Sequence, residues 1–311
     1  MAQRQQQVHP NDFQDSAAWE WIAEHEGFSI ADLRLKYGLE RPYFSWISQL
    51  EAKREYTRKF GPLFEKQWLF PTGVPLEQSS SYATAWFKAA LVTTPYSIDL
   101  CAGMGIDSYA LSQREGLKQH WANELNPDLA QLLQHNLATS KVSCTPAEEL
   151  FEAIEAWKQV LSISATELTI YIDPDRRARG NKAHSIEYTV PNLPSLQGKW
   201  LECAHTLVSK HSPMASVEEL RQLRGCAAIY AVEFLGECKE LLCVQRKDWV
   251  AAPEIHAVVI LEKKEVRLFT SSPISPAVAY TDLIQTFLIQ PGPALSKSGG
   301  HEELLGGVGA K

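Results

Sequence analysis

The chain has 311 residues, 45% of them hydrophobic, which is enough material for one large domain with one or two smaller attachments. Its formal net charge of −7 argues against a surface that coats nucleic acid wholesale, although it leaves room for a local basic groove. The N-terminus has no apolar signal segment, and no window approaches the roughly 18 uninterrupted apolar residues of a membrane span. We therefore expect a cytoplasmic protein with no membrane partner.

The six cysteines predict reduced thiols rather than disulfides or a metal centre. None belongs to a C-x-x-C pair, most lie in apolar runs, and no histidine stands at ligand spacing from a cysteine pair. We therefore expect no metal. The sequence does not indicate an oligomeric state.

Residues 1–70 are predicted to form a small helical region. Apolar residues recur at three- and four-residue spacing in 16–26 and 30–36, and a third helix spans 46–60. This third helix interleaves basic and aromatic residues: Lys53, Arg54, Tyr56, Arg58, Lys59 and Phe60. The pattern suits contact with a phosphate backbone, but we favour a solvated helix face whose glutamates pair with lysines.

A turn-rich segment over 70–75 leads into the main domain, which we place at residues 71–250. Three serines, Ser79 to Ser81, precede an amphipathic helix over 82–92. Their hydroxyls could donate hydrogen bonds to the carboxylate of a ligand. Capping of the helix is the favoured interpretation.

From Ser97 onward, strands and helices alternate as in a doubly wound, Rossmann-like α/β sheet. Seven strands are predicted, at 98–101, 120–123, 142–144, 168–172, 206–209, 227–232 and 240–244. Helices at 109–114, 127–138 and 147–160 join the first four, and the seventh strand is expected to run antiparallel. A β-hairpin, 255–261 with 266–269, is expected in a short extension over 251–297, followed by a flexible tail over 298–311.

The turn after the first strand is the strongest signal of a ligand site. Asp99 ends a buried apolar run, and Gly103 and Gly105 follow it closely. Without Cβ atoms, these glycines allow unusual backbone angles and let a ligand lie against the main chain. The turn could therefore hold NAD, a flavin or S-adenosyl-L-methionine (SAM).

Two further residues narrow the choice of cofactor. Glu124, at the end of the second predicted strand, can accept both hydroxyls of a ribose, although it could also be a strand-end acid beside the helix that starts at Pro127. Ser108 stands where the dinucleotide motif G-x-G-x-x-G has its third glycine, which argues against NAD.

The fourth predicted strand ends in Asp173-Pro174, where it would open onto the same crevice as the glycine turn. Methyl transfer from a sulfonium mainly requires that the nucleophile be held in line. Asp173, or a carbonyl fixed by Pro174, could accept a hydrogen bond from a substrate N–H and aim the nitrogen lone pair at the methyl group. The plainer alternative is a loop opener followed by a surface pair, Arg176 and Arg177.

Six segments of the chain form a set: 76–89 (LEQSSSYATAWFKA), 99–108 (DLCAGMGIDS), 124–127 (ELNP), 172–177 (IDPDRR), 210–214 (KHSPM) and 236–242 (GECKELL). The set resembles the bacterial class I methyltransferases with an appended THUMP-like domain, which are distantly similar to trimethylguanosine synthase. The resemblance covers residues 70–245 and implies SAM as the cofactor. The cofactor-binding residues that we infer with it are Gln78, Ser80, Asp99, Gly103, Gly105, Asp107, Glu124, Asn126 and Glu148.

The chain departs from this family pattern in three places. Asp175 and Arg176 stand where amino-directed methyltransferases continue Asp-Pro with a second proline and an aromatic ring, so an arginine would have to stack on a base or grip a phosphate. Glu148 would replace the Asp that holds the adenine amine. The segment 287–297 resembles only the start of the second half of a THUMP-like domain, so the extension is expected to be partial.

Together these observations predict a SAM-dependent methyltransferase that acts on a base nitrogen of RNA, such as tRNA or rRNA. We expect catalytic roles for Asp173, Pro174, Arg176 and Arg177. Three alternatives stay open: an inactive RNA-binding module that retains the fold, a methyltransferase of a protein or small molecule, and, last, an NAD-dependent oxidoreductase.

Overall fold

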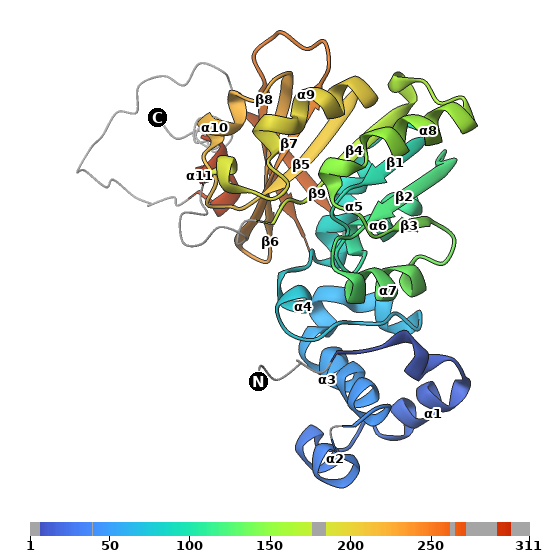
Figure 1. Cartoon of the computed structure of the whole chain (residues 1–311). Helices are drawn as coiled ribbons and strands as arrows, with labels where there is room; N and C mark the ends of the chain where they lie inside the picture. The colour runs from blue at the N-terminus through green and yellow to red at the C-terminus, as the bar shows by residue number, and fades with distance from the viewer. Residues whose placement is uncertain (1–6, 39, 176–184, 262–264, 272–290, 300–311) are drawn as a thin grey trace, which may run out of the picture. The chain divides into compact units, whose positions relative to one another are not determined.

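The structure is a computed structural model that describes residues 7–38, 40–175, 185–261, 265–271 and 291–299 (Figure 1). Its packing divides the chain into two compact units, Met1–Leu150 and Phe151–Lys311, which are described separately. The predicted domain boundaries at residues 70, 250 and 297 stay predictions. None of the described helices is long and apolar enough to cross a membrane.

The first unit opens with the expected helices, α1 (Ser16–Glu24), α2 (Ile30–Tyr37) and α3 (Tyr43–Phe60), after a 3-10 turn, η1 (Pro10–Phe13). Asp15 caps α1 by accepting a hydrogen bond from the backbone N–H of Ala17 (3.0 Å). The apolar stripes of these helices meet in one buried cluster: Val8, Phe13, Ala18, Ile22, Leu33, Ile47, Leu50, Leu69 and Leu132. The helical prediction for this region is therefore confirmed.

Two short helical segments and one longer helix follow: η2 (Gly61–Glu65), α4 (Val74–Gln78) and α5 (Tyr82–Ala90). Ser81 caps α5, since its Oγ accepts a hydrogen bond from the backbone N–H of Thr84 (3.1 Å). Capping is thus confirmed for Ser81 alone among the three serines. Ser80 is buried and has other partners, described below.

The α/β part of the first unit consists of parallel strands in the order β3-β2-β1. The strands are β1 (Tyr96–Asp99), β2 (Gln119–Asn123) and β3 (Lys141–Ser143), joined by α6 (Ile106–Ser112) and α7 (Pro127–Asn136). Asp99 pairs with Ala122 in the register of β1 and β2. The glycine turn and Glu124 therefore both follow the carboxyl ends of neighbouring parallel strands.

The second unit contains the strand order β4-β5-β7-β6-β8-β9. The strands are β4 (Leu168–Ile172), β5 (Thr206–His211), β6 (Cys226–Phe234), β7 (Glu237–Arg246), β8 (Glu254–Ile260) and β9 (Val266–Ser271). The helices of this unit are α8 (Phe151–Leu161), α9 (Leu193–Cys203), α10 (Val217–Arg221) and α11 (Pro293–Ser298). As expected, β7 runs antiparallel, both to β5 and to β6.

The predicted size of the sheet is corrected: among the described residues the sheet contains nine strands rather than seven. All seven predicted strands are present, and the predicted hairpin supplies β8 and β9. β8 pairs in parallel with β6, so that it continues the sheet of the second unit instead of forming a separate extension. The physical reason is that β6 would otherwise present an unpaired edge, and β8 buries apolar residues such as Ile255 and Val258 there.

Two local predictions also need correction. The helix predicted over 147–160 is divided at Leu150 into η3 (Ala147–Glu149) and α8. In the segment 287–297, residues 287–290 lie outside the described residues, and the remainder leads into α11, where Ala294 and Leu295 are buried beside β6, β7 and β8. A THUMP-like character of the extension is not shown, and residues 300–311 of the predicted tail are not described.

Candidate active site

Asp99 anchors the glycine turn of the first unit. One carboxylate oxygen, Oδ1, accepts a hydrogen bond from the backbone N–H of Cys101 (3.1 Å), and Oδ2 accepts one from the hydroxyl of Ser108 (2.7 Å). Asp99 and Ser108 are buried. The serine that replaces the third glycine of a dinucleotide motif therefore ties the first turn of α6 to the end of β1.

The two glycines of the turn have different physical roles. Both have positive φ angles, +57° at Gly103 and +97° at Gly105. A Cβ atom at Gly105 would lie 2.7 Å from Cδ1 of Leu133, so this glycine allows the start of α6 to pack closely on α7. A Cβ atom at Gly103 would meet nothing within 4 Å, so open space lies beside this backbone. Gly103 therefore leaves the room that a ligand against the main chain requires.

Glu124, the predicted ribose-binding residue, is held in place by backbone N–H groups. Its Oε2 accepts a hydrogen bond from the backbone N–H of Gly103 (2.8 Å), and its Oε1 accepts one from that of Asn126 (2.8 Å). Asn126 in turn caps α7, with its Oδ1 accepting from the N–H of Asp128 (2.9 Å). These hydrogen bonds fix both carboxylate oxygens of Glu124 beside the glycine turn.

Asn123 is a structural residue of this turn that our sequence reasoning missed. Its amide nitrogen donates to the carbonyls of Leu100 (3.1 Å) and Thr145 (2.9 Å), while its Oδ1 accepts from the hydroxyl of Ser143 (2.8 Å). The side chain thus joins the segments that follow β1 and β3. The available signal was an amide at the end of an otherwise buried strand.

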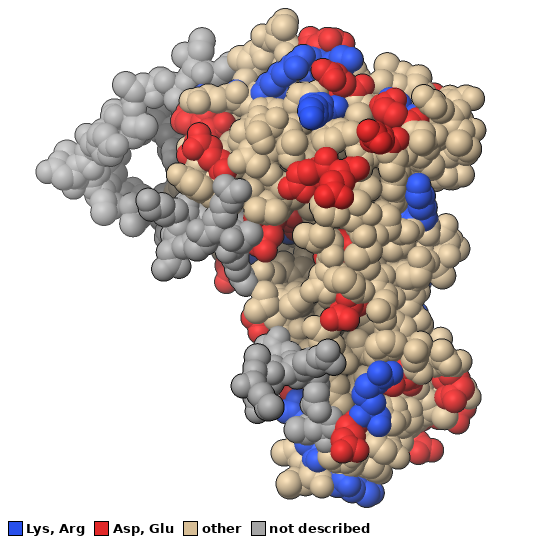
Figure 2. Space-filling model, in the orientation of Figure 1, with Lys and Arg blue, Asp and Glu red and all other residues tan. Residues whose placement is uncertain are grey.

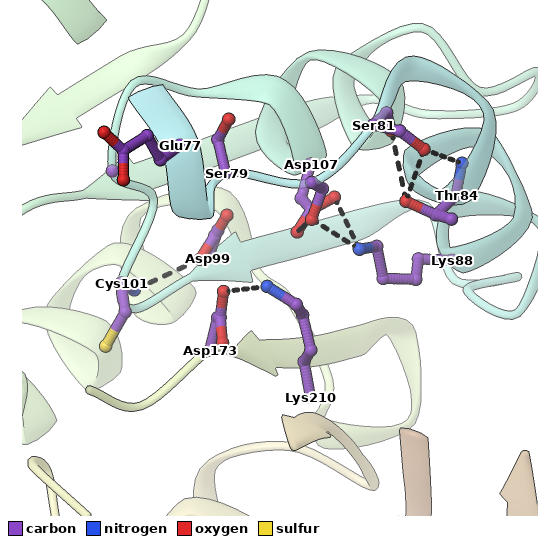
Figure 3. A network of polar contacts seen from close by, with 12 residues as sticks. Glu77, Ser79, Ser81, Thr84, Lys88, Asp99, Cys101, Asp107, Asp173 and Lys210 are labelled. Atoms are coloured by element: carbon purple, nitrogen blue, oxygen red, sulfur yellow. Dashed lines mark hydrogen bonds and ion pairs between the residues drawn. The ribbon is translucent and has the colours of Figure 1, made fainter. Parts of the chain in front are cut away.

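Ser80, Lys88 and Asp107 form a buried cluster with an ion pair between the lysine and the aspartate (Figure 3). Lys88 forms an ion pair with Oδ1 of Asp107 (3.0 Å) and donates a hydrogen bond to Oγ of Ser80 (2.6 Å). Ser80 donates its own hydrogen bond to Oδ2 of Asp107 (2.8 Å). The structure therefore brings the predicted residues Ser80 and Asp107 together around a lysine that sequence reasoning missed, although it lies between the buried positions Ala85 and Ala89.

The remaining cofactor candidates are exposed. Gln78 is the last residue of α4, and Glu148 lies in η3. Lys59 holds α4 by donating hydrogen bonds to the carbonyls of Leu76 (3.2 Å) and Glu77 (2.6 Å). A role of Gln78 and Glu148 in cofactor binding stays a prediction.

The predicted acceptor site lies in the second unit, directly after β4. Asp173 is half-buried, and its Oδ2 accepts a hydrogen bond from Nζ of Lys210 on β5 (2.5 Å; Figure 3). Pro174 is buried, and Asp175 exchanges two backbone hydrogen bonds with Val190 (2.8 Å each). Lys210 was part of the family resemblance, but nothing in the sequence placed it on Asp173.

Part of the predicted acceptor site lies outside the described residues. Arg176 and Arg177 lie outside the described residues. The expected meeting of Asp99 with Asp173 involves both units and stays a prediction. Among the residues that the structure describes, no group of three or more His, Cys, Asp or Glu side chains could hold a metal ion.

The basic cluster of α3 is largely engaged within the protein. Lys53 forms an ion pair with Glu26, and Arg54 donates hydrogen bonds to the carbonyls of Glu26 and Phe28. On the face shown in Figure 2, acidic side chains are widely spread and basic side chains form small separate groups. Lys53 and Arg54 therefore have structural partners within the first unit, and contact of this cluster with a phosphate backbone is not proposed further.

Comparison with known proteins defines the fold. No family model matches the chain, and no curated protein matches it. Among solved structures, a candidate methyltransferase from Porphyromonas gingivalis W83 is 24% identical and aligns with a TM-score of 0.74 over 93% of this chain and 73% of its own. The chain therefore shares the α/β fold of that structure.

Two more distant likenesses have TM-scores below 0.5. An O-methyltransferase from Bacillus cereus, solved in complex with S-adenosylhomocysteine, is 13% identical over 54% of this chain and 83% of its own, with a TM-score of 0.41. A candidate RNA methyltransferase from Pyrococcus horikoshii is 18% identical over 55% of this chain and 81% of its own, with a TM-score of 0.34.

Proposed function

We propose that the chain is a SAM-dependent methyltransferase. The observation that carries this proposal is the turn after β1, where Gly103 has a positive φ angle, open space on its Cβ side, and a backbone N–H bonded to Glu124. A nucleoside-type cofactor needs this combination of an approachable backbone and a nearby fixed carboxylate. The overall fold, shared with a candidate methyltransferase, agrees with it.

The residues present fit this cofactor. The backbone at Gly103 would lie along its methionine part, and Glu124 would accept hydrogen bonds from its ribose hydroxyls. Ser80 and Asp107 are bound to each other and to Lys88, so we propose that they support the part of the site that faces the amino-acid end of the cofactor. Gln78, Asn126 and Glu148 are proposed at its rim. SAM would supply a methyl group on a sulfonium, from which a neutral thioether is a good leaving group.

We propose Asp173 and Pro174 as the residues that hold the acceptor, with Asp173 accepting a hydrogen bond from a substrate N–H. The second oxygen of its carboxylate is suited to this, because Lys210 uses Oδ2. The proposed substrate is a base nitrogen of RNA, such as tRNA or rRNA, with Arg176 and Arg177 gripping the nucleotide. The RNA substrate and the roles of the two arginines rest on the sequence resemblance.

The test is methyl transfer by the purified chain, with tritium-labelled SAM and total RNA from a strain that lacks the gene. We expect label in RNA that is lost after ribonuclease treatment. The variant D173A should lose transfer at least about 10²-fold, because the acceptor is no longer aligned, while SAM affinity stays unchanged. Equal loss of both would show that Asp173 does not act on the acceptor. Label that survives ribonuclease would indicate a protein or small-molecule substrate instead.

A further inference from the structure

The pairing of Asp173 with Lys210 bears on which kind of nitrogen can accept the methyl group. β4 and β5 are parallel neighbours, with Ile172 opposite Ser209, so Asp173 and Lys210 both follow this last paired step. Nζ of Lys210 lies 2.5 Å from Oδ2 of Asp173, and the lysine side chain is only 13% exposed. An ammonium group is therefore held at the carboxylate to which we assign the acceptor.

The neighbours of Lys210 keep its charge poorly solvated. On the opposite side from β4, its partner in the register with β7 is Leu242, which is fully buried. A charge in such surroundings acts more strongly on a reacting group than the same charge in water.

This charge distribution disfavours an exocyclic amine as acceptor. An amine that attacks a methyl group becomes positively charged as the bond forms. A lone carboxylate would stabilise that charge, but the paired ammonium cancels the advantage. A ring nitrogen that carries a proton next to a carbonyl behaves in the opposite way, because loss of its proton places negative charge on the carbonyl oxygen, which an ammonium stabilises.

We propose, on the basis of the function assigned above, that the acceptor is a ring N–H flanked by a carbonyl, as at N1 of guanine or N3 of uracil. The ring nitrogen forms the new N–CH₃ bond, and the S–CH₃ bond of the sulfonium breaks to leave a neutral thioether. The N–H proton passes to the carboxylate of Asp173 and then to solvent. Lys210 stabilises the charge on the carbonyl oxygen while the proton is absent.

The first experiment identifies the methylated nucleoside. The full chain is incubated with tritium-labelled SAM and total RNA from a strain that lacks the gene, and the RNA is digested to nucleosides for chromatography and mass spectrometry. The expected label is in 1-methylguanosine or 3-methyluridine, two outcomes that name the base. Label in an amine-methylated adenosine, cytidine or guanosine, or on a ribose hydroxyl, would overturn this inference and leave the methyltransferase function standing.

Absence of label in any RNA, with SAM still bound by the protein, would instead overturn the RNA part of the proposed function and this inference with it. Failure to bind SAM would reject the proposed function itself. These outcomes are distinct, so the inference and the function beneath it can fail separately.

The second experiment tests Lys210 directly. We expect K210M to lower kcat by about 10² or more, with the KM for SAM unchanged, and K210R to restore most of the rate, because a cation at this position is what the reaction needs. The matched control is K158M. Lys158 lies on α8 of the same unit, is 10% exposed and pairs with Glu155 at 2.7 Å, but has no role in the site. Equal losses in K210M and K158M, or no rescue by K210R, would show that Lys210 is structural only.

Discussion

Gly103 and Gly105 show how two residues of the same type in one turn can serve different purposes. Gly103 leaves space beside the backbone, whereas Gly105 accommodates the side chain of Leu133. The sequence pattern treats them alike, because it records only the absence of a Cβ atom. The distinction depends on α7, which supplies Leu133 from elsewhere in the chain.

This distinction predicts different effects of two alanine substitutions. G105A should lower the free energy of unfolding by about 1–3 kcal/mol, because a Cβ atom there meets Leu133 on a backbone with a φ angle of +97°. G103A should cost less stability but weaken SAM binding, since its Cβ atom enters open space at +57°. Urea denaturation and calorimetric titration of both variants measure the two quantities. The opposite order of the two stability losses would contradict the assignment.

His120 predicts a pH dependence of stability. Burial, with the nearby charge of Arg114, lowers the pKa of His120 to about 3 from the ordinary value of 6.5. Between these two values, His120 is protonated in the unfolded chain but neutral in the folded chain. The contribution of the neutral histidine to stability is therefore complete above pH 6.5 and is lost as the pH falls toward 3. Each pH unit in this window costs up to about 1.4 kcal/mol.

The variant H120Q isolates this contribution. As the pH is lowered from 6.5 to the point at which the wild type unfolds in acid, the free energy of unfolding of H120Q should fall less steeply than that of the wild type. Parallel urea titrations at several pH values provide the measurement. Identical slopes for the two proteins would mean that His120 does not control acid stability.

At the scale of elements, Lys88 and Asp107 connect α5 to α6 and hold Ser80 between them. Lys88 is completely buried, so removal of its charge would leave Asp107 in a site shielded from water. K88M should therefore destabilise the protein by about 3–5 kcal/mol. R221M is the control, because Arg221 forms an exposed pair with Glu218 on α10 and should change stability by at most about 1 kcal/mol. Comparable losses in the two variants, measured by urea denaturation, would rule out a supporting role for the cluster.

The sequence predicts elements well where the local pattern decides them. β4 was predicted at its observed limits, because five consecutive buried residues lie between polar segments. The helix over 147–160 was predicted as continuous, since its apolar face continues through Leu150, and only the structure shows the break. β8 was expected in a separate hairpin because a strand does not reveal its partner, and its parallel pairing with β6 is a long-range contact.

In the candidate site, too, local sequence patterns were predictable and long-range contacts were not. Asp99, Gly103 and Glu124 could be found because the ends of parallel strands carry ligand-binding residues at a characteristic spacing. Lys88 and Lys210 could not be placed, because their partners come from other elements and a lone lysine in a sequence usually indicates a solvated surface. The two lysines are the main addition that the structure makes to the site.

For the whole molecule, the proposal assigns different tasks to the two units. The first unit contains the glycine turn, Glu124 and the Lys88 cluster, to which we assign the cofactor. The second contains Asp173 and Lys210, to which we assign the acceptor. This division explains why changes at Gly103 should affect SAM affinity, whereas changes at Asp173 should affect transfer without affecting that affinity.

The central claim, that this chain binds SAM at the turn after β1, is tested most directly by calorimetric titration of the full chain with SAM. We predict binding at a single site, with the affinity reduced at least about tenfold in E124A, which removes the carboxylate bonded to Gly103. NAD should produce no binding heat under the same conditions. No binding heat with SAM at millimolar concentration, or an E124A variant that binds SAM as tightly as the wild type, would contradict the account.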